Sequence, residues 1–314
     1  MAFAALTLFG YFYYNVPVHF ADQDGATDFV WEHNTVYNRL TEGFGYGRTN
    51  NEGYMNLFDY QEGMDIDVLI MGSSHLEAQF IPEKNNVSYL LNERLIDKNI
   101  YNISISGHSF KVCLNNLESA LRKYSPSYVV IETGNLVFSD EYIKSIMTGN
   151  VEEKGSYSEG LLGLLQQNPF LRLMYTQIES IANKYEDIEA DESNTTVSDV
   201  EINKTLTGDL LKFIKMTADN YETKVIILYH PDVAIGQDGK MVIETKDISS
   251  EFDELCQKNG IHFVDMTERF LSEYENGYIL PKGFCNTAVA SGHLNSEGHR
   301  MIADELYKEI MGMD

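Results

Sequence analysis

The chain has 314 residues, of which 43% are apolar, so it can bury a sizeable core in one large domain or two small ones. Its 48 acidic and 23 basic residues leave a formal charge of −25. This charge argues against a nucleic-acid-binding protein, because phosphate contacts depend on clustered Lys and Arg. The three cysteines, Cys113, Cys256 and Cys285, lack the spacing of a zinc site or of a disulfide framework.

Residues 1–20 form an apolar N-terminal segment with no Lys or Arg before Arg39. Its length suits a short membrane anchor, or a signal-like segment without the usual basic start. A core or interface helix is the alternative. We expect the anchor, and therefore an extracytoplasmic domain on a single tether.

Residues 21–64 are rich in Asn, Gly and Tyr and predict an irregular extension. Beyond it, short apolar runs rich in Val and Ile alternate with segments of helical periodicity. Continuous apolar runs indicate strands that are buried on both faces, and the helical segments supply the crossovers that parallel strands require. Residues 65–314 are therefore expected to form a doubly wound α/β sheet, which binds ligands at the C-terminal ends of its strands. The runs are Asp67–Met71, Ile100–Ile105, Tyr128–Glu132, Lys224–Tyr229 and Ile261–Val264.

Residues 136–220 are too long for an ordinary connection and are expected to be an insertion. They include an apolar helical stretch, Leu161–Ile181, and an acidic run at 185–199 that predicts a solvated loop. The insertion could cover the site, bind a partner or be decoration.

Polar residues follow three of the predicted strands. Gly72, Ser73 and Ser74 end the first run, where a serine is exposed and free backbone N–H groups can stabilise an anion. Gly107 follows the second strand and Asn135 the third, and these residue types supply the donors of an oxyanion hole. Each group alone could also be ordinary turn chemistry.

A serine nucleophile needs a base within hydrogen-bond reach. His293 precedes the predicted last helix, on a loop that can reach the strand ends, and is the best candidate for that base.

Four other histidines are not assigned to this pair. No carboxylate stands at metal-ligand spacing from them, so neither a metal nor another cofactor is expected. His75 and His230 are expected to contact substrate, His108 to face solvent and His299 to lie on the surface of the last helix.

Together these segments resemble the sequence blocks of the SGNH, or GDSL-type, hydrolase superfamily over residues 65–314. The resemblance implies a three-layer α/β/α fold with a five-stranded parallel, flavodoxin-like sheet. It places Ser74 as the nucleophile and His293 as the base, with an oxyanion hole formed by Ser74, Gly107 and Asn135. Ser73 stands where the family carries an acid.

Two departures from the family pattern matter. Asn135 follows Gly134 directly, so its role as a donor depends on how the strand ends. Ala290 occupies the place of the acid that orients the histidine, and loss of that acid weakens catalysis. Three explanations are open: a main-chain carbonyl or Asp232 holds His293 in a Ser-His dyad, the acid was replaced on purpose, or the domain is catalytically dead.

The resemblance is to membrane-tethered SGNH proteins of bacterial envelopes. It implies a serine-dependent O-acyl, foremost acetyl, transferase or esterase acting on a cell-surface polysaccharide, with a membrane-bound O-acyltransferase as a possible partner. One alternative is an impaired domain that binds or scaffolds glycan for such an acyltransferase. A cytosolic lipase-like esterase is a third possibility.

Overall fold

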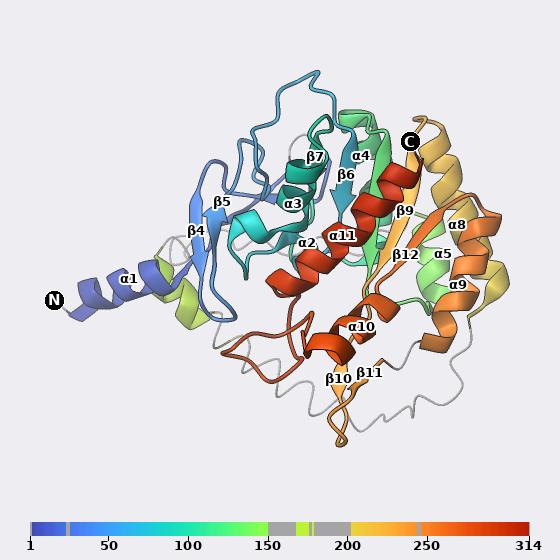
Figure 1. Cartoon of the computed structure of the whole chain (residues 1–314). Helices are drawn as coiled ribbons and strands as arrows, with labels where there is room; N and C mark the ends of the chain where they lie inside the picture. The colour runs from blue at the N-terminus through green and yellow to red at the C-terminus, as the bar shows by residue number, and fades with distance from the viewer. Residues whose placement is uncertain are drawn as a thin grey trace.

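The computed structural model describes residues 2–22, 26–149, 168–175, 178, 202–243 and 246–313. The centre of the molecule is a parallel sheet of five strands (Figure 1). Numbered along the chain, these strands lie in the order 2-1-3-4-5, which is the flavodoxin-like order of a doubly wound sheet. The expected fold class is therefore confirmed. In spatial order the strands are β7 (Ile100–Asn102), β6 (Val68–Met71), β8 (Tyr128–Thr133), β9 (Lys224–Tyr229) and β12 (His262–Asp265).

Helices cover both faces of the sheet and bury one apolar cluster on each side (Figure 1). Every residue of β6 and β8 is buried, as expected for strands covered on both faces. One face carries α3 (Val87–Arg94), α10 (Thr267–Gly277) and α11 (Ser296–Met313). The other carries α4 (Phe110–Tyr124), α5 (Asp140–Met147), α8 (Lys204–Asp219) and α9 (Lys246–Lys258).

Residues 14–60, here called the N-terminal layer, contain short antiparallel strands rather than only the irregular chain expected. They pack beside β7, where Asn50 Nδ2 donates to the Tyr101 hydroxyl at 2.7 Å and Asn56 Nδ2 donates to the Asn102 carbonyl at 2.8 Å. One sheet consists of β1 (Tyr14–Asn15), β4 (Val36–Arg39) and β5 (Gly45–Arg48), and a second of β2 (His19–Ala21) and β3 (Phe29–Trp31).

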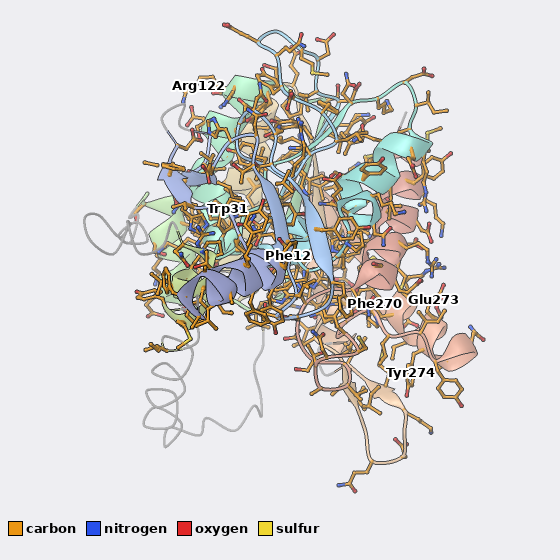
Figure 2. The ribbon with its side chains drawn as sticks, turned by 90° about the vertical axis from the view of Figure 1, so that its left-hand side faces the viewer. Phe12, Trp31, Arg122, Phe270, Glu273 and Tyr274 are labelled. Atoms are coloured by element: carbon orange, nitrogen blue, oxygen red, sulfur yellow. The ribbon has the colours of Figure 1, made fainter. Side chains whose placement is uncertain are left out.

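The apolar N-terminal segment forms the 12-residue helix α1 (Ala2–Tyr13), which projects from the N-terminal layer (Figure 1). Gly10 lies against the backbone of residues 169–170, where a Cβ atom would come within 2.4 Å of the Phe170 nitrogen. Figure 2 looks onto this side of the molecule and shows Phe12 on α1 and Trp31 on β3. Within the part of the chain that the structure describes, no helix has both the length and the apolar composition needed to cross a membrane.

The expected insertion at 136–220 contains two helices of the main fold. α5 and α8 both contribute buried residues to the apolar cluster on their face of the sheet. The acidic run at 185–199 and most of the stretch Leu161–Ile181 lie outside the described residues.

Candidate active site

The turn formed by residues 72–74, which carries the predicted nucleophile, joins β6 to the short helix α2 (Ser74–Glu77) at the C-terminal edge of the sheet. Ser73 is the N-cap of α2, and its hydroxyl oxygen accepts a hydrogen bond from the His75 N–H at 3.2 Å. Ser74 is the first helical residue, so its own N–H has no partner within the helix. Its side chain is partly exposed, as a nucleophile requires.

His293 lies within hydrogen-bond reach of Ser74. The distance from His293 Nε2 to Ser74 Oγ is 2.9 Å. The imidazole stacks on the Phe80 ring, with ring centroids 3.9 Å apart, and the His293 carbonyl accepts from the Gly283 N–H at 3.0 Å. These contacts hold the ring in the plane where Nε2 meets the serine. The expected Ser74–His293 pair is thus brought together.

The far nitrogen of His293 contacts Glu42, a residue of the N-terminal layer that was not expected at the site. Glu42 Oε2 lies 2.8 Å from His293 Nδ1, and Oε1 accepts from the His293 backbone N–H at 2.6 Å. Burial raises the pKa of Glu42, but the hydrogen bonds from His293 and the charge of Arg39 outweigh it, so the pKa lies below its usual value. An ionised Glu42 fixes the tautomer in which Nδ1 carries the proton and Nε2 can accept one.

Two features of the loops around Glu42 allow its contact with His293. The Gly43 N–H donates to Asn286 Oδ1 at 2.8 Å, which ties the N-terminal layer to the loop before His293. Gly292 has φ +95°, and a Cβ atom there would lie 2.2 Å from Glu42 Oε1. Glycine at 292 therefore admits the carboxylate.

The structure bears on the first of the three explanations for the missing acid, in which a main-chain carbonyl or Asp232 holds His293. Ala290 is buried in an apolar cluster with φ +59°, and no acid is needed there because Glu42 holds the imidazole from the other side. The idea that Asp232 orients His293 is wrong: Asp232 pairs with Lys282 at 2.5 Å, since that buried ammonium requires a counter-charge. Ser74, His293 and Glu42 thus form a continuous series of contacts, here called the Ser-His-Glu triad, rather than a Ser-His pair alone.

Three hydrogen-bond donors follow β6, β7 and β8, at the C-terminal edge of the parallel sheet. Among the described residues, the N–H groups of Ser74 and Gly107 and the amide Nδ2 of Asn135 have no protein partner. Gly107 is exposed and has φ +90°, a conformation that favours glycine. Asn135 is also exposed, and its Oδ1 accepts from the Val137 N–H at 3.0 Å, which orients the amide. These groups are available to an oxyanion.

The other histidines differ from expectation in burial. His230 is 1% exposed and its Nε2 lies 2.6 Å from Glu132 Oε1, so it cannot reach a substrate. His108 does not face solvent: it is 6% exposed, and burial lowers its pKa to about 4. His299 is not on the helix surface either; it is fully buried and its Nδ1 accepts from the Val87 N–H at 3.3 Å. Helical position alone does not reveal that α11 turns this side chain towards α3.

His75 is the one of these histidines that stays partly exposed next to the triad. Its ring centroid lies 5.0 Å from that of His293, and its Nδ1 accepts from the Leu294 N–H at 3.3 Å. Burial and the neighbouring imidazoles and Lys282 hold its pKa well below the usual value, so it is neutral. Contact with a substrate remains a prediction for His75.

A pocket of about 370 Å³ borders the turn at Ser73, although Ser74 and His293 are not among the residues that line it. Asn135 lies at this pocket, and Phe110, Phe138 and Tyr142 form an aromatic wall in which the ring of Phe138 stacks on both of its neighbours. Across the described residues, no three His, Cys, Asp or Glu side chains are grouped as metal ligands. The Ser74–His293 contact is of the kind that activates a serine, and the free N–H groups are of the kind that stabilise an oxyanion.

Two glutamates were missed by sequence reasoning. Glu42 carried no usable signal, because it is one acid among several in a Gly-rich segment. Glu132 did carry one, since it is an acid at the end of the apolar strand β8, beside the strand that leads to Ser74.

No family model and no curated protein matches this chain. Among solved structures, it is similar to the psychrotrophic esterase EstA from Pseudoalteromonas sp., with 15% identity, a TM-score of 0.43, and coverage of 79% of this chain and 98% of that one. It is also similar to a lipase/acylhydrolase from Enterococcus faecalis, with 11% identity, a TM-score of 0.43, and coverage of 79% and 97%. A member of the lipolytic G-D-S-L family from Veillonella parvula gives 13% identity, a TM-score of 0.42, and coverage of 77% and 97%. These sequence identities and TM-scores are too low to assign an activity, so the chemistry of the chain follows only from its own residues.

Proposed function

We propose that the chain is a serine-dependent acyl-ester enzyme that works through a covalent acyl-serine intermediate. The observation that carries this proposal is the unbroken chain of contacts from Ser74 Oγ through His293 to the Glu42 carboxylate, at 2.9 and 2.8 Å. The three free donors at the same edge of the sheet add the other element that acyl transfer requires.

In the proposed reaction, Ser74 Oγ attacks the ester carbonyl as its proton passes to His293 Nε2. The Nδ1–H of the resulting imidazolium donates to Glu42, which stabilises the positive charge. The N–H groups of Ser74 and Gly107 and the amide of Asn135 hold the oxyanion. Collapse of the tetrahedral intermediate expels the alcohol, which takes the proton from His293 and leaves the acyl group on Ser74.

The same intermediate serves hydrolysis or transfer. Water or a sugar hydroxyl gives its proton to His293 Nε2 as it attacks the carbonyl carbon of the acyl-serine. The bond from that carbon to Ser74 Oγ then breaks, Oγ takes the proton back from His293, and the acyl group leaves as the free acid or as the sugar ester. We propose O-acyl esters of a cell-surface polysaccharide, foremost acetyl esters, as substrates, and a membrane-bound O-acyltransferase as a partner. These assignments rest on the resemblance of the sequence blocks.

For the location, we propose that α1 contacts a membrane outside the cytoplasm. Its apolar side chains are unusually open, with Phe12 70% and Phe3 57% exposed. Exposed apolar surface of this kind favours a lipid or protein partner.

Flotation with zwitterionic vesicles tests this location. The wild type should be recovered with the lipid, whereas the double variant Phe9→Ser/Phe12→Ser should stay in the protein fraction. Equal flotation of both would remove this part of the proposal.

The test of the activity is turnover of p-nitrophenyl acetate and release of acetate from acetylated polysaccharide. Ser74→Ala should abolish both. The matched control is Ser127→Ala, at an exposed serine just before β8, at the end of that strand away from the site, which should keep the wild-type rate. Wild-type turnover by Ser74→Ala would refute the proposal.

A further inference from the structure

Glu132 is a carboxylate inside the central sheet. It is the fifth residue of β8 and only 4% exposed. An ionised carboxylate in such surroundings is costly unless it is paired and hydrogen-bonded. A buried carboxylate at this position therefore indicates a role that offsets the cost of burial.

The carboxylate of Glu132 accepts three hydrogen bonds from two residues. Oε2 accepts from the Ser73 backbone N–H at 2.6 Å, and Oε1 accepts from the Ser73 hydroxyl at 2.8 Å. His230 Nε2 lies 2.6 Å from Oε1. Burial alone raises the pKa of Glu132, but the bonds from His230 and Ser73 outweigh it and leave the pKa below its usual value. The group is ionised at neutral pH.

These bonds fix the backbone that leads into the nucleophile. Gly72 passes so close to Glu132 that a Cβ atom would lie 2.1 Å from Oε2. Ser73, held at its N–H and its hydroxyl, is extended and caps α2. Ser74 therefore enters α2 in one orientation, with Oγ towards His293 and its N–H unused by the helix.

The same network reaches the loop of the base. The ring of His230 lies 4.7 Å from that of His75, and His75 accepts from the N–H of Leu294, the residue after His293. The Glu132–His230 pair thus touches both the turn that carries the nucleophile and the histidine beside the base.

We propose that Glu132 is a positioning residue for Ser74. Its carboxylate, oriented by His230, sets the Ser73 peptide so that Ser74 Oγ meets His293 and the Ser74 N–H faces the oxyanion. Among the described residues, Glu132 contacts neither the triad nor the free donors, so it acts through its hydrogen-bond partners Ser73 and His230. The inference rests on the proposed function, because it requires Ser74 to be the nucleophile.

The test compares Glu132→Gln with Glu309→Gln. Glu309 forms another Glu–His pair, with His262 at 2.7 Å, away from the site, and is the matched control. With p-nitrophenyl acetate, Glu132→Gln should lower kcat about a hundredfold, the order expected for a misplaced reacting group, with KM unchanged. Glu309→Gln should keep the wild-type kcat.

Titration with a serine-directed phosphonate separates positioning from folding. A positioning role predicts one labelled Ser74 per Glu132→Gln chain, formed slowly. Fewer labelled chains with an unchanged rate per labelled site would mean that Glu132 only supports folding, and would overturn the inference.

Substitutions of Ser73 test the same Ser73–Glu132 hydrogen bond from its other partner. They keep the inference falsifiable if Glu132→Gln does not fold. Ser73→Ala should lower kcat about tenfold, the loss expected for one hydrogen bond to a charged group. Ser73→Thr keeps the hydroxyl and should restore the rate. If Ser74→Ala is inactive but Glu132→Gln and Ser73→Ala keep the wild-type kcat, only the positioning role of Glu132 is wrong. If Ser74→Ala is fully active, the proposed function is wrong, and the positioning role is wrong with it.

Discussion

Replacing Glu42 with Gln tests the acid that the N-terminal layer supplies. The substitution keeps the size of the side chain but removes its charge. If the Gln amide oxygen keeps the bond from the His293 backbone N–H, its NH₂ group faces His293 Nδ1. A donor at that position favours the tautomer with the proton on Nε2, which cannot accept a proton from Ser74.

The expected loss follows from the contact of Glu42 with His293 Nδ1, at 2.8 Å, because Gln keeps the bond from the His293 backbone N–H. A hydrogen bond to a charged group contributes about 1.5–3 kcal/mol, and about 1.4 kcal/mol corresponds to a factor of ten, so loss of this bond alone should lower kcat about 10- to 10²-fold. The wrong tautomer of His293 extends the expected loss to about 10⁴-fold. The upper end is the size of the loss, about 10⁴-fold, when the acid of a Ser-His-Asp triad becomes an amide.

The assay is steady-state turnover of p-nitrophenyl acetate, with thermal unfolding as a check that the variant folds. Glu62→Gln, at an exposed acid near the end of the same extension, is the matched control and should retain the wild-type kcat. A Glu42→Gln enzyme with kcat within threefold of the wild type would refute the reasoning that Glu42 orients the base.

Three further predictions concern the surrounding groups. Asn135→Ala should slow kcat about a hundredfold or more, as loss of one oxyanion donor does; an unchanged kcat would exclude the amide from the oxyanion hole. Ala290→Asp should lower the melting temperature, because it places an acid in an apolar cluster, and should not restore a Glu42→Gln enzyme; restored turnover would contradict the assignment of the acid. Burial raises the pKa of Glu77 to about 7, against hydrogen bonds from Ser106 and Trp31, so the fluorescence of this single tryptophan should titrate near pH 7 and lose that step in Glu77→Gln. A step that persists in Glu77→Gln would assign the titration to another group.

Glu77 and Glu132 affect stability in opposite pH ranges. The folded-state pKa of Glu77 is raised, so its contribution to the free energy of unfolding is complete below its usual pKa of 4.5 and is lost as the pH rises through about 7. The folded-state pKa of Glu132 is lowered, so its contribution is present above its usual pKa and is lost as the pH falls through the folded-state value. Urea unfolding as a function of pH should show each slope flattened in the matching Gln variant, and parallel curves would contradict both directions.

The sheet could be predicted because its strands are buried on both faces. Burial makes β6, β8 and β9 continuous apolar runs, and a polar residue at the end of such a run marks the edge of the sheet. Ser74 and His293 could be proposed for the same reason, since both stand at boundaries of elements that the pattern locates.

Glu42 could not be predicted because its role depends on tertiary packing. It is 251 residues from His293 along the chain, in a layer whose short strands have weak patterns. Its approach depends on the Gly43–Asn286 contact and on the missing side chain of Gly292, which no local rule relates to an acid. The predicted exposure of His230 and His299 is wrong for the same reason, because the strands and helices packed around them determine their burial.

The most direct test of the central claim is the rate at which a serine-directed phosphonate labels the protein, with the modified residue located by peptide mass spectrometry. The triad predicts one adduct per chain on Ser74, formed rapidly in the wild type and much more slowly in Glu42→Gln and His293→Ala. Labelling at another serine, or equal rates at Ser74 in all three proteins, would contradict a nucleophile activated by His293 and Glu42.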